Sequence, residues 1–331
     1  MTTRQKVRIE ALRERRCQTL VVDSFSSGGA PLPLETENPE EGRVISHFGL
    51  NVEIEDVRGT RIRCAVRETL GTEPVCGDRV WWSRSDAASG QGVIWTILER
   101  ANTLRRPTGG GDVQTVAANI DTLMVTLAAD RLNTGLLDRY LVAAEANAME
   151  AVIVINKMDR IDSEDGLVAV LQPYRAMDYR IFFVSALTGR GMDDLEVVLR
   201  DRTSIFSGHS GVGKSSIVSR WVENGEGPVI GPEHLPTGQG RHTTTVARMY
   251  SLPLGGWLID SPGIREFGLA DISRESLALY FRDVVRHSRP CRFADCSHEH
   301  EPGCGVKEAV SQGRVTRTRY ESMLRIFHSL S

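Results

Sequence analysis

Long apolar runs are missing from this chain, and so is a dominant charge of one sign. No stretch of the 331 residues approaches the ~20 apolar side chains needed to cross a bilayer, and no signal-peptide core stands at the N-terminus. Hydrophobic residues make up 40% and charged residues 25%, an ordinary balance for a globular protein. The composition predicts a cytoplasmic protein of two or three domains without a membrane segment.

The net charge of −3 argues weakly against a uniformly basic surface for binding nucleic acid, and it is compatible with local basic patches. Two such patches are visible, at residues 4–16 and 314–325. Their basic residues are Arg4, Lys6, Arg8, Arg13, Arg15, Arg16, Arg314, Arg317, Arg319 and Arg325. Each patch fits either a nucleic-acid contact or a solvated helix face, and the sequence leaves both interpretations open.

Cysteines are few, and half of the six crowd into fourteen residues. In a cytosolic protein such crowding favours a metal site over disulfides. The crowded cysteines stand with one histidine in the order Cys291, Cys296, His298 and Cys304. Three thiolates and one imidazole suit a tetrahedral Zn²⁺, and their softness favours zinc over magnesium or calcium. The alternatives are a disulfide with one spare thiol, or His287 or His300 in place of His298.

Composition changes three times along the chain. Residues 1–41 are charged, then rich in Ser, Gly and Pro, then acidic, which is typical of a flexible arm. Residues 42–104 hold about five short alternating segments, which predicts a small β-barrel of the OB-fold type. A glycine-rich linker at 107–111 precedes an α/β domain at 113–268. A mostly helical zinc-binding domain is predicted at 269–331.

Aromatic residues are scarce, at 6% of the chain, and three of the five tryptophans fall within the predicted barrel. Trp81, Trp82 and Trp95 could stack on nucleic-acid bases if they face outward. For any single one of them, packing in the barrel core is the more ordinary role.

Apolar segments of the α/β region alternate with helical patterns, which predicts a parallel sheet. Strands are expected at 122–126, 151–155, 181–184, 204–206 and 257–259, and a helix buries Leu137, Tyr140, Leu141 and Ala144. Two later helices are expected to have apolar faces made of Leu277, Tyr280, Phe281 and Val284, and of Tyr320, Met323, Leu324 and Phe327. The motifs described next begin where strands end, the edge at which open α/β sheets bind ligands.

One glycine-rich segment fits the phosphate-binding loop G-x-x-x-x-G-K-[ST]. It comprises Gly208, His209, Ser210, Gly211, Val212, Gly213, Lys214 and Ser215, and Ser216 follows it. The glycines allow backbone N–H groups to surround phosphates, and the helix that starts near Lys214 adds its positive end. Lys214 should reach the β- and γ-phosphates, and the Ser215 hydroxyl should bind Mg²⁺.

A second motif selects the base. Asn156, Lys157 and Asp159 fit N-K-x-D, in which the Asp159 carboxylate can accept hydrogen bonds from N1 and the exocyclic amine of guanine. Asn156 should read the purine edge, and the Lys157 stem should cover the ring. Ser185 and Ala186 follow the next strand and should close over the base. Because adenine offers no such donor pair, the chain is predicted to bind GTP and GDP.

A third motif and a switch segment complete the set. Asp260 and Gly263 fit D-x-x-G, in which Asp260 should hold Mg²⁺ through water and the Gly263 N–H should sense the γ-phosphate. A switch threonine that binds Mg²⁺ is needed between the P-loop and this motif. Thr244 is favoured, and Thr243 and Thr245 remain alternatives.

The glutamine that many GTPases place just after D-x-x-G is missing. Ile264 stands in its place and cannot orient the attacking water. Hydrolysis must then use another group and should be slow without a partner. His242 in the switch is the candidate catalytic residue because its ring titrates near neutral pH. An exposed loop histidine is the alternative, and His209 is a second candidate.

These motifs stand in an inverted order, because N-K-x-D precedes the P-loop that opens an ordinary GTPase domain. The inversion predicts a circularly permuted domain that ends at its switch. The zinc-binding domain directly downstream would then be pulled by the switch.

In this order the motifs resemble those of the ribosome small subunit-dependent GTPase A family, the circularly permuted ribosome-biogenesis GTPases of bacteria. The resemblance covers nearly the whole chain from residue 42, and further matching segments lie at 117–121, 136–141, 242–245 and 260–268. The resemblance implies an OB-fold, a permuted P-loop α/β GTPase domain and a mostly helical domain with one structural Zn²⁺. It also implies Mg²⁺ with the nucleotide, 16S rRNA binding, and GTP hydrolysis stimulated by the small (30S) subunit late in its maturation. His242 would be the catalytic residue.

The sequence departs from the family at His209, where a glutamine is frequent, and in the N-terminal arm. We expect a monomer that acts on the small subunit. Two alternatives stay open, an RNA-binding scaffold that nucleotide merely stabilises and a permuted GTPase of the large subunit. The missing glutamine favours the scaffold, whereas Lys214, Ser215 and Asp260 argue against it.

Overall fold

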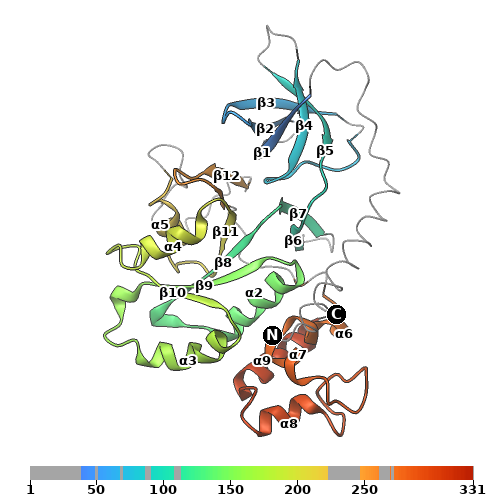
Figure 1. Ribbon diagram of the computed structural model, residues 1–331, viewed down its shortest axis with the longest axis vertical. Helices are drawn as coiled ribbons and strands as arrows, with labels where there is room; N and C mark the ends of the chain where they lie inside the picture. The colour runs from blue at the N-terminus through green and yellow to red at the C-terminus, as the bar shows by residue number, and fades with distance from the viewer. Residues whose placement is uncertain are drawn as a thin grey trace, which may run out of the picture. The chain divides into compact units, whose positions relative to one another are not determined.

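The computed structural model describes residues 39–48, 51–67, 70–85, 91–107, 113–222, 247–260, 269 and 272–330. The chain divides into two compact units, with the boundary between Arg100 and Ala101. Figure 1 shows the helices and strands of each unit.

The first unit contains a closed β-barrel (Figure 1). Its strands are β1 (Glu40–Phe48), β2 (Asn51–Asp56), β3 (Arg61–Val66), β4 (Arg79–Arg84) and β5 (Gly92–Ile97). Strand β1 pairs antiparallel with both β2 and β4, β2 pairs with β3, β4 pairs with β5, and β3 lies parallel to β5. The ring of pairings is the OB-fold architecture, and it confirms the predicted barrel.

Alternate strand residues point into the barrel, as the pleat of a strand requires. The buried cluster comprises Val44, Val52, Ile54, Ile62, Cys64, Val80, Trp82 and Ile94. Trp82 is fully buried, whereas Trp81 and Trp95 are half-buried among the outward positions. Gly92 makes room for Trp82, because a Cβ there would lie 2.8 Å from the Trp82 ring and 2.6 Å from the Cys64 sulfur. The core role therefore holds for one of the three tryptophans.

The second unit is built on a mostly parallel sheet. Its strands are β8 (Thr122–Ala128), β9 (Glu150–Asn156), β10 (Arg180–Phe183), β11 (Thr203–Ser207), β12 (Arg248–Ser251) and β13 (Trp257–Asp260). They lie in the order β10-β9-β8-β11-β13-β12, and only the β12–β13 pair is antiparallel. The five predicted strands are all present, and β12 is an additional edge strand that the sequence pattern did not reveal.

Helices cover this sheet. They are η2 (Ala129–Arg131), α2 (Thr134–Ala146), η3 (Met158–Arg160), α3 (Asp165–Ala176), α4 (Met192–Leu199) and α5 (Lys214–Val218). Met124 of β8 and Phe206 of β11 pack with α4 and α5 in one apolar cluster. Helix α2 packs on β8 and β9 and buries the four residues predicted for it. Its first turn is capped by Asn133, whose side chain accepts the N–H of Leu136 at 3.0 Å.

The predicted linker at 107–111 lies between two paired strands. Strands β6 (Thr103–Pro107) and β7 (Val113–Ala118) form an antiparallel pair, with Arg105 opposite Thr115. The glycine-rich stretch therefore connects the two strands of a hairpin. The sequence missed this pairing because the glycines resemble an interdomain spacer.

The chain ends in a group of short helices, which are α6 (Arg274–Leu277), η4 (Ala278–Tyr280), α7 (Arg282–His287), α8 (Gly305–Ser311) and α9 (Arg317–Ser329). The prediction of one helix with a face from Leu277 to Val284 is wrong. Phe281 has an extended backbone (φ −102°, ψ 104°) that separates η4 from α7, and its ring is fully buried. No helix in the described part of the chain is long and apolar enough to cross a membrane.

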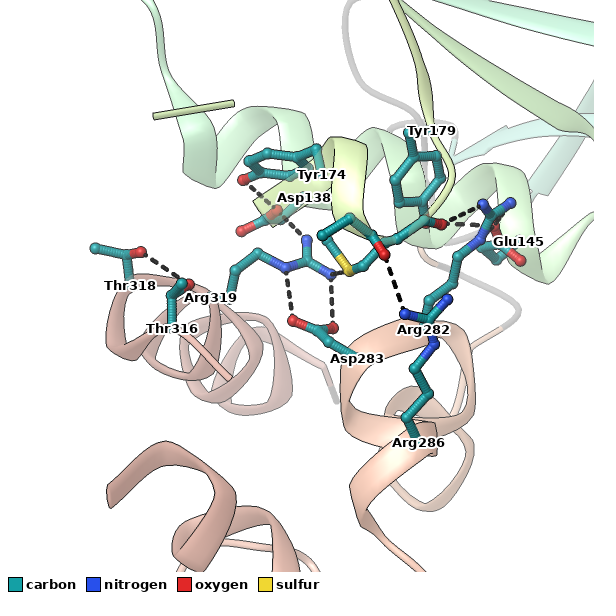
Figure 2. Close-up of polar contacts among 12 residues, drawn as sticks. Asp138, Glu145, Tyr174, Tyr179, Arg282, Asp283, Arg286, Thr316, Thr318 and Arg319 are labelled. Atoms are coloured by element: carbon teal, nitrogen blue, oxygen red, sulfur yellow. Dashed lines mark hydrogen bonds and ion pairs between the residues drawn. The ribbon is translucent and has the colours of Figure 1, made fainter. Parts of the chain in front are cut away.

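Helix α9 buries a face different from the predicted one. Arg319, Ser322, Met323 and Ile326 are buried, at i, i+3, i+4 and i+7. Arg319 therefore belongs to the protein interior and contacts two carboxylates (Figure 2), while Arg317 and Arg325 stay exposed. For Arg319 both interpretations of the basic patch are wrong, because the paired charges allow burial.

Replacing Trp82 with alanine should destabilise the barrel by about 3–5 kcal/mol, because the substitution leaves a cavity in a closed core. The Trp81→Ala variant is the matched control, and it should cost less than about 1 kcal/mol. Hydrogen exchange of the β2 and β3 amides measures barrel opening separately from the second unit. Equal losses in the two variants would contradict the inward placement of Trp82.

Candidate functional site

The P-loop joins β11 to α5 and requires glycine at two close approaches. Gly208 has φ +149°, and a Cβ on it would lie 2.1 Å from the carbonyl oxygen of Thr126 in β8. Gly213 has φ +93°, and a Cβ on it would lie 2.3 Å from the Nδ2 atom of Asn156. The loop is thus seated against β8 on one side and against the N-K-x-D motif on the other.

Asn156 connects three loops at the end of β9. It is buried, its Nδ2 donates to the carbonyl oxygen of Val212 at 2.9 Å, and its Oδ1 accepts the N–H of Ala186 at 3.1 Å. The Lys157 ammonium donates to the carbonyl oxygen of Gly211. The predicted base-reading residues and the predicted phosphate-binding loop are therefore bonded to each other across more than fifty residues of sequence.

Asp159 and Ser185 form the next contact of this group. The Ser185 hydroxyl donates to Asp159 Oδ1, and this bond is the main cause that lowers the pKa of the exposed Asp159 carboxyl. Ser185 also accepts the N–H of Thr188 at 3.2 Å. The hydrogen bond therefore favours the ionised form of this surface carboxylate.

Lys214 is the first residue of α5, which follows β11 through the P-loop, and Asp260 ends β13, the parallel neighbour of β11. The Lys214 ammonium donates to the carbonyl oxygens of Gly208 at 2.7 Å and His209 at 3.1 Å. Burial raises the pKa of Asp260, and the charge of Lys214 opposes that shift. The predicted phosphate lysine and the predicted magnesium carboxylate therefore lie close enough for their charges to interact.

The remaining loop residues divide into two groups. Ser210, Ser215 and Ser216 are exposed around the start of α5. Thr243, Thr244, Thr245, His242 and Gly263 lie outside the described residues, and their roles stay predictions.

The four cysteine and histidine residues converge in the C-terminal helices. Their ligand atoms all lie within 4.8 Å of one another, and the three cysteines form no disulfide. The Nδ1 atom of His298 lies 3.6 Å from the Cys291 sulfur and 3.4 Å from the Cys304 sulfur, and these two sulfurs are 3.9 Å apart. Tetrahedral zinc bonds place such donor atoms about 3.5–3.8 Å apart. The cluster can thus hold a metal ion.

Backbone N–H groups face the cysteine sulfurs. Gly305 donates to the Cys291 sulfur at 3.3 Å, and Lys307 donates to the Cys304 sulfur at 3.5 Å in the first turn of α8. Such bonds stabilise thiolates, which are the form of cysteine that binds metal. His300 has a side chain that is 84% exposed, so it is not a ligand here.

Two residues that support the Cys/His cluster were not predicted from the sequence. Tyr320 donates its hydroxyl to the carbonyl oxygen of His298 at 2.7 Å, where the backbone is left-handed (φ +66°). Glu301 accepts from the Ser297 N–H at 2.9 Å and from its hydroxyl at 2.7 Å. The carboxylate within the Cys/His run was a visible signal for Glu301. The periodicity of the last helix predicts only an apolar contact for Tyr320.

Comparison with known proteins bears on the whole chain. Residues 97–270 match the family model described as RsgA GTPase. The chain belongs to the RsgA GTPase family. A relative from Klebsiella pneumoniae (strain 342), the small ribosomal subunit biogenesis GTPase RsgA, is 41% identical over 88% of this chain and 84% of its own length.

Two solved structures are similar to this RsgA-family chain. YjeQ from Thermotoga maritima has a TM-score of 0.73 and 34% identity, and the match covers 88% of this chain and 99% of that one. YloQ, described as a circularly permuted GTPase, has a TM-score of 0.71 and 26% identity, and the match covers 91% of this chain and 98% of that one. The inverted motif order and these neighbours confirm the predicted fold, and family membership makes the protein a GTP hydrolase.

Substitution Cys304→Ser should remove the bound metal and loosen α8 and α9, because one of four ligands and a helix cap are lost. Elemental analysis of the purified protein should find one zinc ion per chain, and much less in the variant. The His300→Ala variant is the control and should keep its zinc. Equal zinc in Cys304→Ser would contradict this ligand set.

Proposed function

We propose that this protein acts in late maturation of the small (30S) ribosomal subunit, hydrolysing GTP to GDP and phosphate when the subunit stimulates it. The GTP-binding part of this proposal is supported by the hydrogen bonds from Asn156 and Lys157 to the P-loop backbone. These bonds fix the distance between the residues that would contact the base and the loop that would contact the phosphates. Relatives named as small ribosomal subunit biogenesis GTPases support the subunit as partner.

Guanine would be read by the loops that follow β9 and β10. Asp159, held by Ser185, accepts from the base N1 and exocyclic amine, and Asn156 contacts the purine edge. The Ala186 N–H is fixed by Asn156 beside the base, and the Lys157 stem covers the ring. The ordered carboxylate gives selectivity for guanine over adenine.

Phosphates and Mg²⁺ would bind at the ends of β11 and β13. The backbone N–H groups of the P-loop and the Lys214 ammonium hold the phosphates. Ser215 and Thr244 supply hydroxyl ligands to Mg²⁺, and Asp260 binds the ion through water. The N–H of Gly263 senses the γ-phosphate.

Catalysis would use His242, since Ile264 in the position after D-x-x-G offers no polar atom to a water molecule. A near-neutral imidazole can orient or accept a proton from the attacking water. Hydrolysis releases the γ-phosphate contacts of the switch, and the protein then leaves the subunit. Correctly formed rRNA would order His242 and so time this step.

Ribosomal RNA would bind on both flanking domains. On the barrel, the Trp95 indole donates to the Ser83 hydroxyl at 2.8 Å, and the Arg67 guanidinium lies 3.6 Å from the Trp95 ring centroid. In the C-terminal domain, Phe293 is 41% exposed and Arg292 lies 5.6 Å from its ring centroid. A partly or fully exposed aromatic ring paired with arginine suits unpaired bases and phosphates.

The domain bounds and the setting complete the proposal. The predicted bounds are an N-terminal arm at residues 1–41, an OB-fold at 42–104, a permuted G domain at 113–268 and a zinc-binding domain at 269–331. Strand β1 of the barrel already begins at Glu40, and the first compact unit ends at Arg100. One structural Zn²⁺ holds the last domain through its thiolates and imidazole. The protein works as a cytoplasmic monomer.

The Asp159→Asn substitution should weaken GDP and GTP binding by about 100-fold or more, because two hydrogen bonds to a charged acceptor are lost. Xanthosine diphosphate should bind the variant better than it binds the parent, since xanthine has a carbonyl where guanine has its amine. Titration with fluorescent nucleotides measures both effects. Asp162→Asn, at an exposed neighbour, is the control, and unchanged GDP affinity in Asp159→Asn would reject the guanine assignment.

The His242→Ala substitution should lower subunit-stimulated turnover by about 10²–10⁴-fold while nucleotide affinity stays the same. Phosphate release with small subunits at saturating GTP measures the rate, and equilibrium titration measures the affinity. His209→Ala tests the second candidate in the same assay. Parent-like turnover in His242→Ala would show that another group activates the water.

A further inference from the structure

A buried arginine joins the C-terminal helices to the G domain (Figure 2). The Arg319 side chain of α9 is 3% exposed, and its guanidinium bonds to the Asp138 carboxylate of α2. On its other side it forms two bonds to Asp283 of α7, at 3.0 and 3.2 Å. The rings of Tyr174 and Phe281 lie 5.1 and 4.8 Å from its central carbon. One side chain therefore contacts the three helices α2, α3 and α7 and the ring of Phe281, which lies between η4 and α7.

A second arginine extends this contact surface. Arg282 of α7 donates to Glu145 of α2 at 2.7 Å and to the carbonyl oxygen of Met177 at 2.9 Å, and it lies 4.0 Å from the Tyr179 ring centroid. Arg286 donates to the last carbonyl of α3 at 3.1 Å. Three arginines of the C-terminal helices thus hold α2 and the end of α3 (Figure 2).

The contact between the C-terminal helices and α2 depends on a specific geometry of charged groups. Two buried carboxylates need the guanidinium, and removing it would leave them uncompensated in the interior. Tyr174 of α3 also donates its hydroxyl to Asp138 at 2.8 Å. A pose that shifted α9 by one turn would break the three bonds from Arg319 and leave both carboxylates without their buried cation.

The helices that Arg319 and Arg282 contact are adjacent in sequence to the strands β9 and β10, whose following loops would contact the base. Helix α2 leads into β9, which ends at Asn156, and α3 stands between N-K-x-D and β10. Tyr179 immediately precedes β10, and Val184 immediately follows it. Val184 donates to the carbonyl oxygen of Ile155 at 2.8 Å and accepts the N–H of Met158 at 3.2 Å. The four-residue strand β10 therefore connects Tyr179, which contacts Arg282, to Val184, which is bonded beside the N-K-x-D loop.

We propose that Arg319 is a positioning residue for guanine-nucleotide retention. It holds α2 and α3 against the C-terminal helices, and these helices keep the loops of Asn156 and Ser185 preorganised for the base. Linkage makes the effect reciprocal, so a partner that displaces the C-terminal helices from α2 and α3 speeds nucleotide release. The inference rests on the guanine site proposed above.

The test is the dissociation rate of fluorescent GDP from the full-length protein after mixing with excess unlabelled GDP. Arg319→Met should release GDP at least about fivefold faster than the parent, the lower range of ordinary coupling between sites. Arg319→Lys keeps the charge and should fall between the two. Arg317→Met is the matched control, because that side chain is 85% exposed on the same helix, and its rate should equal that of the parent.

A second variant covers a folding failure of Arg319→Met, which leaves two buried carboxylates unpaired. Arg282→Met removes the half-buried anchor and should also speed release. Zinc content and circular dichroism report whether each variant is folded, and hydrogen exchange of the α2 amides reports loosened docking. A folded variant with loosened docking and parent-like GDP dissociation overturns the proposal. Failure of the parent itself to retain GDP would instead refute the guanine site.

Discussion

The arrangement of the candidate nucleotide site depends on one buried amide, that of Asn156. Its two ends bond to the P-loop at Val212 and to the Ser185–Ala186 loop at Ala186, so three loops from three strands share one side chain. An amide is suited to this position because it donates and accepts at once without a charge to desolvate. The position of this amide also explains Gly213, because a Cβ on that residue would collide with the amide nitrogen.

Circular permutation changes the chain order but not the meeting of these loops. Among the described residues, N-K-x-D, the Ser185–Ala186 loop, the P-loop and Asp260 stand at the C-terminal ends of parallel strands, so the sheet brings them together whichever motif comes first. What permutation changes is the element that follows D-x-x-G. The C-terminal helices follow Asp260 in the chain and, through Arg319 and Arg282, contact α2 and α3, the helices on either side of the strand that ends at Asn156.

Much of this arrangement was predictable from the sequence, because apolar periodicity and motif spacing are local. The strands that end at Asn156, Ser207 and Asp260 and the Cys/His cluster follow from such patterns. Burial of Arg319 was not predictable, because its carboxylate partners lie up to 181 residues away in the sequence. The break at Phe281 and the inward choice of Trp82 over Trp81 likewise depend on tertiary packing, which periodicity does not contain.

The central claim is that a guanine-specific hydrolase is switched on by the small ribosomal subunit. Multiple-turnover phosphate release from GTP by the purified protein, alone, with small subunits and with large subunits, tests it most directly. The account predicts slow release by the protein alone and a large increase with small subunits only. Equal rates in all three conditions, or stimulation by large subunits alone, would contradict it.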